Sequence, residues 1–261
     1  MMANDRLRQF CTLLFAVGQA VASGITPRMG LPPVGSISDR YPTYVVPAGY
    51  AFSIWGLIFA LSIAYAVWQM LPAQRENPLL RRVGWLTAIA FAGSTFWQFA
   101  FPAGQYALSV ALIVTTLVSL ALAVGRMAGW KTRLTGPERW LVWVACGLYL
   151  GWITVATVAN VAQALAASGI SELGLGAEAW GIVMLIAAGL IAATVTLATR
   201  NGGYPLTVIW ALVAAYVARR GPPVVTQSDA VAYAALGAAA VVALALVMVV
   251  MRSRGTAGAR V

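Results

Sequence analysis

One apolar segment carries aromatic and amide side chains at helical spacing. Tyr149, Trp152, Ala156, Asn160 and Gln163 are separated by 3, 4, 4 and 3 residues. At 100° per residue they form one helical stripe about 80° wide. Rings beside amides suit a flat, mostly apolar ligand with a few polar edges. Hydrogen bonds between helices are the alternative role for Asn160 and Gln163.

A second aromatic row follows a proline-rich loop. Pro42 and Pro47 are expected to keep the chain extended. A helix is predicted to begin near Pro47, because proline in the first turn loses no hydrogen bond. From there Phe52, Trp55 and Phe59 recur at i, i+3 and i+7 on one face. We interpret this face as one wall of a pocket, with packing or lipid contact as the alternative.

A third row consists of Ser94, Trp97 and Phe101 at spacings of 3 and 4. None of the apolar segments contains Asp, Glu, Lys or Arg, and the chain has no histidine. Proton relays, charge-coupled transport and most metal sites need such groups at membrane depth. Hydrolase and nucleotide-binding motifs are also absent from the sequence. The sequence therefore predicts binding by stacking and amide contacts, with no catalytic residue, no metal site and no required cofactor.

The elements that position these rows are predicted to be membrane helices. Of 261 residues, 61% are hydrophobic and 9% charged, against about 25% charged in soluble domains. About 20 apolar residues cross a bilayer, and we expect an all-α, polytopic bundle of about eight spans. Tryptophan is concentrated before residue 168, so residues 1–168 are predicted to form a five-helix domain and 169–261 three additional helices with a short basic tail. The spans are expected near 9–25, 47–71, 83–101, 106–125, 140–167, 179–199, 203–218 and 230–251.

The net charge of +10 is distributed unevenly between the two sides. With the N-terminus inside, only four of the 17 Lys and Arg residues fall in outer loops: Arg28, Arg40, Arg219 and Arg220. This pattern predicts a cell-membrane protein with both termini in the cytoplasm. The basic charge then indicates contact with anionic lipid, and no nucleic-acid partner is expected. A cleaved signal peptide ending near residue 22 is the alternative for the first segment.

Smaller features leave alternatives open. The long outer loop, 26–46, has the composition of a binding loop, a lid or a plain flexible connection. Cys11 and Cys146 lie in apolar segments and are expected to be buried free thiols. Gly147 and Gly151 permit close helix contact, either within the chain or in a homodimer.

Three stretches together resemble the tryptophan-rich sensory protein family (TspO/MBR), which includes the translocator or peripheral benzodiazepine receptor proteins. Residues 42–59 resemble its proline- and tryptophan-rich loop and second helix, and 94–97 its third-helix Asn-x-x-Trp segment. Residues 149–160 resemble the fifth-helix pattern Tyr-Leu-x-Trp-x-x-x-Ala-Thr-x-x-Asn, the most specific match. The resemblance covers roughly 9–167 and implies a five-helix, often dimeric bundle. The three helices after residue 168 would make this chain a long form.

The resemblance also implies a ligand and a set of ligand-binding residues. Family members bind porphyrins and other tetrapyrroles, sterols or benzodiazepine-like drugs. Tyr44 and Tyr50 replace tryptophan, and Ser94 replaces asparagine, so the polar contacts are expected to differ. Carried over residue by residue, the pocket consists of Tyr50, Phe52, Trp55, Ser94, Trp97, Tyr149, Trp152 and Asn160.

The leading interpretation is a membrane protein that binds a hydrophobic small molecule, a porphyrin or other tetrapyrrole, in sensing, regulation or transport. Membrane lipid and a second copy of the chain are the other expected partners. One alternative is an eight-span small-molecule transporter, or permease. The other is a membrane enzyme that degrades the bound tetrapyrrole.

Overall fold

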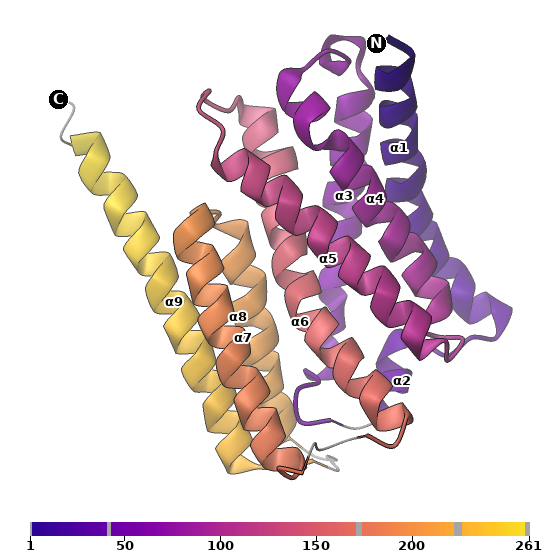
Figure 1. Cartoon of the computed structure of the whole chain (residues 1–261), viewed down its shortest axis with the longest axis vertical. Helices are drawn as coiled ribbons and strands as arrows, with labels where there is room; N and C mark the ends of the chain where they lie inside the picture. Colours follow the sequence, from indigo (N-terminus) through magenta and orange to yellow (C-terminus); the bar gives the residue numbers. More distant parts are fainter. Residues whose placement is uncertain (1, 41–42, 171–173, 222–225, 259–261) are drawn as a thin grey trace.

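The computed structural model describes residues 2–40, 43–170, 174–221 and 226–258. Within these ranges the chain is all-α, as predicted, and Figure 1 shows the helices packed side by side. Short 3-10 segments interrupt the connections at Thr26–Met29, Gly49–Ser53 and Pro72–Gln74, and a π-helical stretch, Glu138–Val144, leads into α6. The helices are α1 (Met2–Ile25), α2 (Val34–Arg40), α3 (Ile54–Met70), α4 (Pro78–Ala100), α5 (Tyr106–Ala128), α6 (Ala145–Ala167), α7 (Ala177–Thr199), α8 (Gly203–Arg220) and α9 (Asp229–Gly258).

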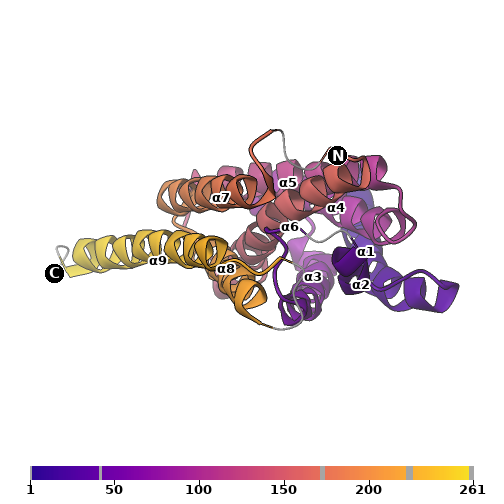
Figure 2. The same cartoon turned by 90° about the horizontal axis from the view of Figure 1, so that it is seen from below.

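Helix α6 occupies the middle of the bundle. It packs against α5 and α8, while α1 packs against α3 and α4, and α9 against α7 and α8. In Figure 1, α7, α8 and α9 lie on one side of α6, and α1, α3 and α4 lie on the other. The end view in Figure 2 has α9 at one edge and α1 near the other. The predicted aromatic stripe is therefore on the most enclosed helix.

Six helical segments in the described part of the chain are long and apolar enough to cross a membrane, so the expectation of eight was wrong. The predicted spans 83–101 and 203–218 do form α4 and α8, but they are not among the six. Their polar side chains, such as Thr87, Gln98 and Thr207, are buried inside the bundle. A helix shielded by its neighbours can carry polar groups that lipid would exclude. The six are Asn4–Met29, Gly49–Met70, Tyr106–Ala128, Glu138–Ala167, Ala177–Thr199 and Asp229–Ser253.

The long loop and the start of the next helix also differ from expectation. The loop 26–46 contains a 3-10 turn and the two-turn helix α2. Ala48 is extended at φ −57° and ψ 147°, a 3-10 turn covers Gly49–Ser53, and α3 begins only at Ile54. Pro47 therefore precedes the helix instead of starting it. The delay places Phe52 on the turn and Trp55 on the helix.

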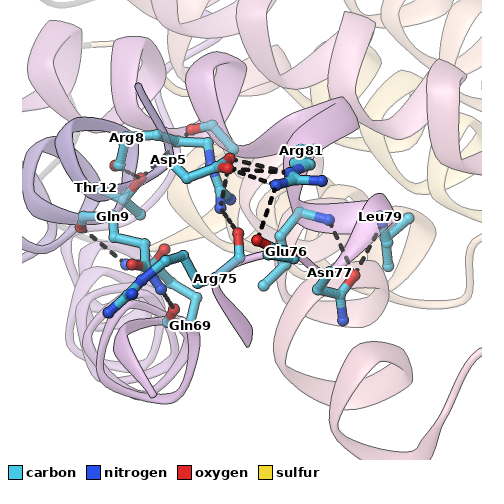
Figure 3. Close-up of polar contacts among 12 residues, drawn as sticks. Asp5, Arg8, Gln9, Thr12, Gln69, Arg75, Glu76, Asn77, Leu79 and Arg81 are labelled. Atoms are coloured by element: carbon cyan, nitrogen blue, oxygen red, sulfur yellow. Dashed lines mark hydrogen bonds and ion pairs between the residues drawn. The ribbon is translucent and has the colours of Figure 1, made fainter. Parts of the chain in front are cut away.

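Two ionisable residues are buried near the start of α1, just before the predicted span 9–25. Asp5 and Arg8 lie inside the longer apolar segment Asn4–Met29, and both are buried. Figure 3 shows Arg81 of α4 pointing at Asp5, with an Nη2–Oδ2 distance of 2.6 Å. Arg8 lies over Gly84, where a Cβ would be 2.8 Å from the Arg8 side chain. The ion pair between Asp5 and Arg81, and the lack of a side chain on Gly84, let α1 pack closely on α4.

Next to this contact, two glutamine side chains join α1 to α3 by hydrogen bonds to backbone carbonyls. Gln69 Nε2 donates to the Gln9 carbonyl at 2.9 Å, and Gln9 Nε2 donates to the Gln69 carbonyl. Both amides are buried, where a paired polar group costs far less than an unpaired one. The polar cluster in Figure 3 thus joins three helices at one end of the bundle.

Candidate functional site

Trp55 lies at the centre of a cluster of aromatic rings from three helices. Its ring centroid is 5.9 Å from that of Trp97 on α4, with the planes 27° apart. It is 6.0 Å from that of Trp152 on α6, at 84°. Trp152 meets Phe52 edge to face at 5.8 Å, and Trp97 stacks on Phe101 at 5.0 Å. Such pairs each add about 0.5–1.5 kcal/mol beyond burial, so the rings form one packed aromatic surface.

Asn160 connects this surface to a fourth helix, α5. Trp97 Nε1–H donates to Asn160 Oδ1 at 2.8 Å, and Asn160 Nδ2 donates to Ser109 Oγ of α5 at 3.0 Å. All three side chains are buried. The amide therefore links α4, α5 and α6, which confirms the interhelical role that the sequence left open. One amide hydrogen and one oxygen lone pair remain for another partner.

A small cavity adjoins the aromatic surface. Its volume is about 20 Å³, room for about one water molecule. Five of the eight predicted binding residues line it. Two of its lining residues carry a buried N–H group, at Trp152 Nε1 and Gln163 Nε2, that has no hydrogen-bond partner among the described residues. The lining consists of Val34, Pro47, Phe52, Trp55, Trp97, Phe101, Trp152, Val155, Ala156, Ala159, Asn160 and Gln163.

The other three predicted residues do not line the cavity. Tyr50 is 45% exposed, and its ring meets Trp210 of α8 edge to face at 5.3 Å. Ser94 is buried deeper along α4. Tyr149 is buried too, and its hydroxyl donates to Gln19 Oε1 of α1 at 2.8 Å. In this conformation Ser94 and Tyr149 contribute to packing between helices, and Tyr50 contributes to the contact with α8.

A short segment with a turn at Tyr44 and Val45 borders the cavity, and α8 holds it in place. We call residues 43–48 the strap, and Pro47 of the strap lines the cavity. The Ala48 N–H donates to the Ala214 carbonyl of α8 at 3.1 Å. Trp210 Nε1–H of α8 donates to the Ala51 carbonyl, just beyond the strap, at 3.2 Å. Helix α8 therefore supports the site through the strap and Ala51, although the lining residues come from other elements.

Sequence reasoning did not assign Gln163 or Trp210 to the site. Its spacing already places Gln163 on the aromatic stripe of α6, with a hydrogen bond between helices as the alternative role. Trp210 bonds to a residue 159 positions earlier in the chain. No local pattern in the sequence indicates such a contact.

The two glycines of α6 pack within the chain. A Cβ on Gly147 would lie 2.0 Å from the Asn201 side chain, and one on Gly151 would lie 2.3 Å from the Tyr204 carbonyl oxygen. Both neighbours belong to α8 or its N-terminal turn. Of the two alternatives, this motif therefore serves intramolecular packing between α6 and α8. Cys146, beside it, is a buried free thiol, whereas Cys11 is only half-buried.

The helices and the aromatic site define a multi-pass α-helical membrane protein with a small, aromatic-walled cavity. A family model described as TSPO-like protein matches residues 7–248. The chain belongs to this family, in agreement with the resemblance of its aromatic rows. The match continues through α7 and α8 into α9, so the division at residue 168 stays a prediction. No curated protein and no solved structure shows a significant match to the chain.

Proposed function

We propose that this protein binds a flat, largely apolar small molecule between α3, α4 and α6, and that the ligand is a tetrapyrrole such as a porphyrin. One observation carries the proposal. Trp55, Trp97 and Trp152 line one cavity, and two of its lining residues, Trp152 and Gln163, carry buried N–H donors without a partner among the described residues. The family membership supports a ligand-binding role in sensing, regulation or transport.

The unpaired donors restrict the chemistry of the ligand. Trp152 Nε1–H and the N–H groups of Gln163 Nε2 can only be satisfied by acceptors, such as carbonyl or carboxylate oxygens. A buried donor without a partner costs about 1–3 kcal/mol. A ligand that supplies an oxygen at these positions recovers this free energy. We therefore expect porphyrins with carboxylate side chains to bind more tightly than porphyrins without them.

Binding requires the site to open. Ligand pockets usually enclose about 300–1,000 Å³, and the cavity has about 20 Å³. Asn160 ties α4, α5 and α6 together, whereas the strap has no regular secondary structure of its own. The strap is therefore the element expected to move when a planar ligand enters. Such opening lowers the affinity by the free energy of the rearrangement.

Titration of the purified protein with protoporphyrin tests the proposal. Saturable quenching of tryptophan fluorescence is expected. Trp152→Ala should weaken binding about tenfold or more, since it removes both a ring contact and a donor worth roughly 1.4 kcal/mol together. Trp152→Phe keeps a ring and should lose only the donor.

Trp140→Ala is the matched control, because Trp140 is 65% exposed and lies away from the cavity lining. It should leave the affinity unchanged. Unsaturable quenching that is the same in Trp152→Ala and Trp140→Ala would refute binding at this site. Titration with a porphyrin that lacks carboxylates provides the second comparison, which checks the role of the donors.

We also propose that both termini face the cytoplasm. α1 begins and α9 ends at the same end of the bundle in Figure 1. An even number of membrane crossings places both termini on the same side. The excess of arginine in the predicted inner segments supports the cytoplasmic side. Labelling of a cysteine introduced at Ser253, near the end of α9, by a membrane-impermeant reagent from one side of sealed vesicles tests it.

A further inference from the structure

Arg219 is buried at the end of α8, where it contacts the strap. Its Nη1 donates to the Thr43 carbonyl at 3.3 Å, and its Nη2 donates to the Val46 carbonyl at 3.4 Å. The guanidinium also lies over the Tyr44 ring, 5.8 Å from the centroid. Nη1 has one more partner, the Thr226 hydroxyl, just before α9. Arg219 of α8 therefore contacts three residues of the strap, Thr43, Tyr44 and Val46.

These contacts are weak for a buried charge. Arg219 is 5% exposed, and it forms no ion pair with a carboxylate of the described residues. Its Nε has no partner among those residues. Both bonds to the strap exceed the usual 2.9–3.0 Å, and a buried cation without a paired anion is costly. The two hydrogen bonds from Arg219 to the strap can thus be replaced by hydrogen bonds to water at little cost in free energy.

A second hollow lies beside the strap. It has a volume of about 80 Å³ and adjoins a direct contact between the strap and α7, where a Cβ on Gly181 would be 2.5 Å from the Tyr44 Cβ. Tyr44 and Val45 form one wall of it, and Trp180 and Met184 of α7 form the opposite wall. Helix α6 borders both spaces, with Ala159 at the cavity and Ala162 at the hollow. Opening of the strap therefore has to release the contact between Tyr44 and Gly181 as well as the bonds to Arg219.

We propose that Arg219 is a positioning residue that latches the strap closed over the aromatic cavity, so that α8 controls access of the ligand. This inference rests on the proposed function for the identity of the site. It assigns a task to the C-terminal helices, which is to hold the gate through Arg219. The neighbouring Arg220 is 41% exposed at its side chain and pairs with Asp229 at 2.9 Å instead. Arg220 therefore provides a matched control.

The first measurement needs no ligand. In a background of Cys11→Ser and Cys146→Ala, Val46→Cys introduces a thiol on the strap, at a position only 8% exposed. Its labelling by a maleimide reports how often the strap opens. Arg219→Met should accelerate labelling about tenfold, as expected when two or three weak hydrogen bonds are lost. Arg219→Lys, which keeps the charge, should have an intermediate rate, and Arg220→Met should match the wild type.

The second measurement uses protoporphyrin in stopped-flow fluorescence. Arg219→Met should raise its association and dissociation rates together, with a smaller change in equilibrium affinity. Loss of a residue that only stabilises the fold would not raise both rate constants while leaving the affinity nearly unchanged. Equal labelling rates in Arg219→Met and Arg220→Met would overturn the latch, even if protoporphyrin binds. If Arg219→Met does not fold, a wild-type labelling rate in Arg219→Lys would overturn it. Faster labelling without protoporphyrin binding would retain the latch and reject the proposed ligand.

Discussion

Replacement of Gly151 by alanine tests the contact between α6 and α8 directly. The added methyl would lie 2.2 Å from Thr207 Oγ1 and 2.3 Å from the Tyr204 carbonyl oxygen. The threonine can rotate, but the carbonyl belongs to the backbone of α8 and cannot. The two helices must separate by about 1 Å to restore van der Waals contact. Because Gly151 precedes Trp152, that movement also displaces the aromatic wall.

The magnitude follows from a comparison with a second glycine. Overpacking typically costs about 1–3 kcal/mol, and a contact with backbone belongs at the upper end of that range. Alanine also has a higher helix propensity than glycine by about 1 kcal/mol. Gly237→Ala in α9 has the same gain, since nothing lies within 4 Å of the position that its Cβ would occupy. The propensity gain cancels between the two variants, which leaves a difference of about 3 kcal/mol.

Thermal unfolding in detergent, followed by tryptophan fluorescence, measures this difference. At about 2–4 °C per kcal/mol for a chain of this size, Gly151→Ala should unfold about 6–12 °C below Gly237→Ala. Adding Thr207→Ala to Gly151→Ala should recover only part of the loss, because the carbonyl clash remains. Equal unfolding temperatures for Gly151→Ala and Gly237→Ala would refute the close packing of α6 on α8.

Three further substitutions test other contacts by the same unfolding assay. Asn160→Ala should destabilise the protein by about 1–3 kcal/mol, because it leaves the buried Trp97 N–H without an acceptor; an unchanged unfolding temperature would contradict the link between α4 and α6. Tyr65→Phe should cost less, about 0.6 kcal/mol, since Thr87 keeps a second hydrogen bond to a backbone carbonyl. Arg8→Met should be neutral or stabilising, because two nitrogens of that buried guanidinium have no partner among the described residues; a large loss would mean that its contact with α4 outweighs the cost of the charge.

The aromatic rows show how far local spacing predicts a site. Phe52, Trp55, Trp97 and Trp152 come from three segments, and the structure brings their rings together. Helical periodicity fixes which side chains share a face, and a row of rings on an apolar helix must pack somewhere. Spacing could not reveal that Asn160 is already bonded between two helices. The partner of an amide depends on which helices are neighbours.

The sequence by itself determined the class of this protein: an all-α membrane bundle with aromatic rows and TSPO-like character. These properties follow from composition and from residues a few positions apart. It overestimated the number of spans, because apolar length and the absence of charge admitted α4 and α8, whose polar side chains lower their hydropathy below that of the six candidate spans. Helices such as α4 hide their polar side chains among neighbours.

Only the tertiary structure decided which residues close the site. The bonds from Trp210 to Ala51 and from Arg219 to the strap join residues more than 150 positions apart. Such contacts arise from the packing of α8 on α6, which two glycines permit by letting the backbones approach. The cavity is small, and the strap over it is held by long hydrogen bonds. Both facts depend on distances between segments that no spacing within one segment contains.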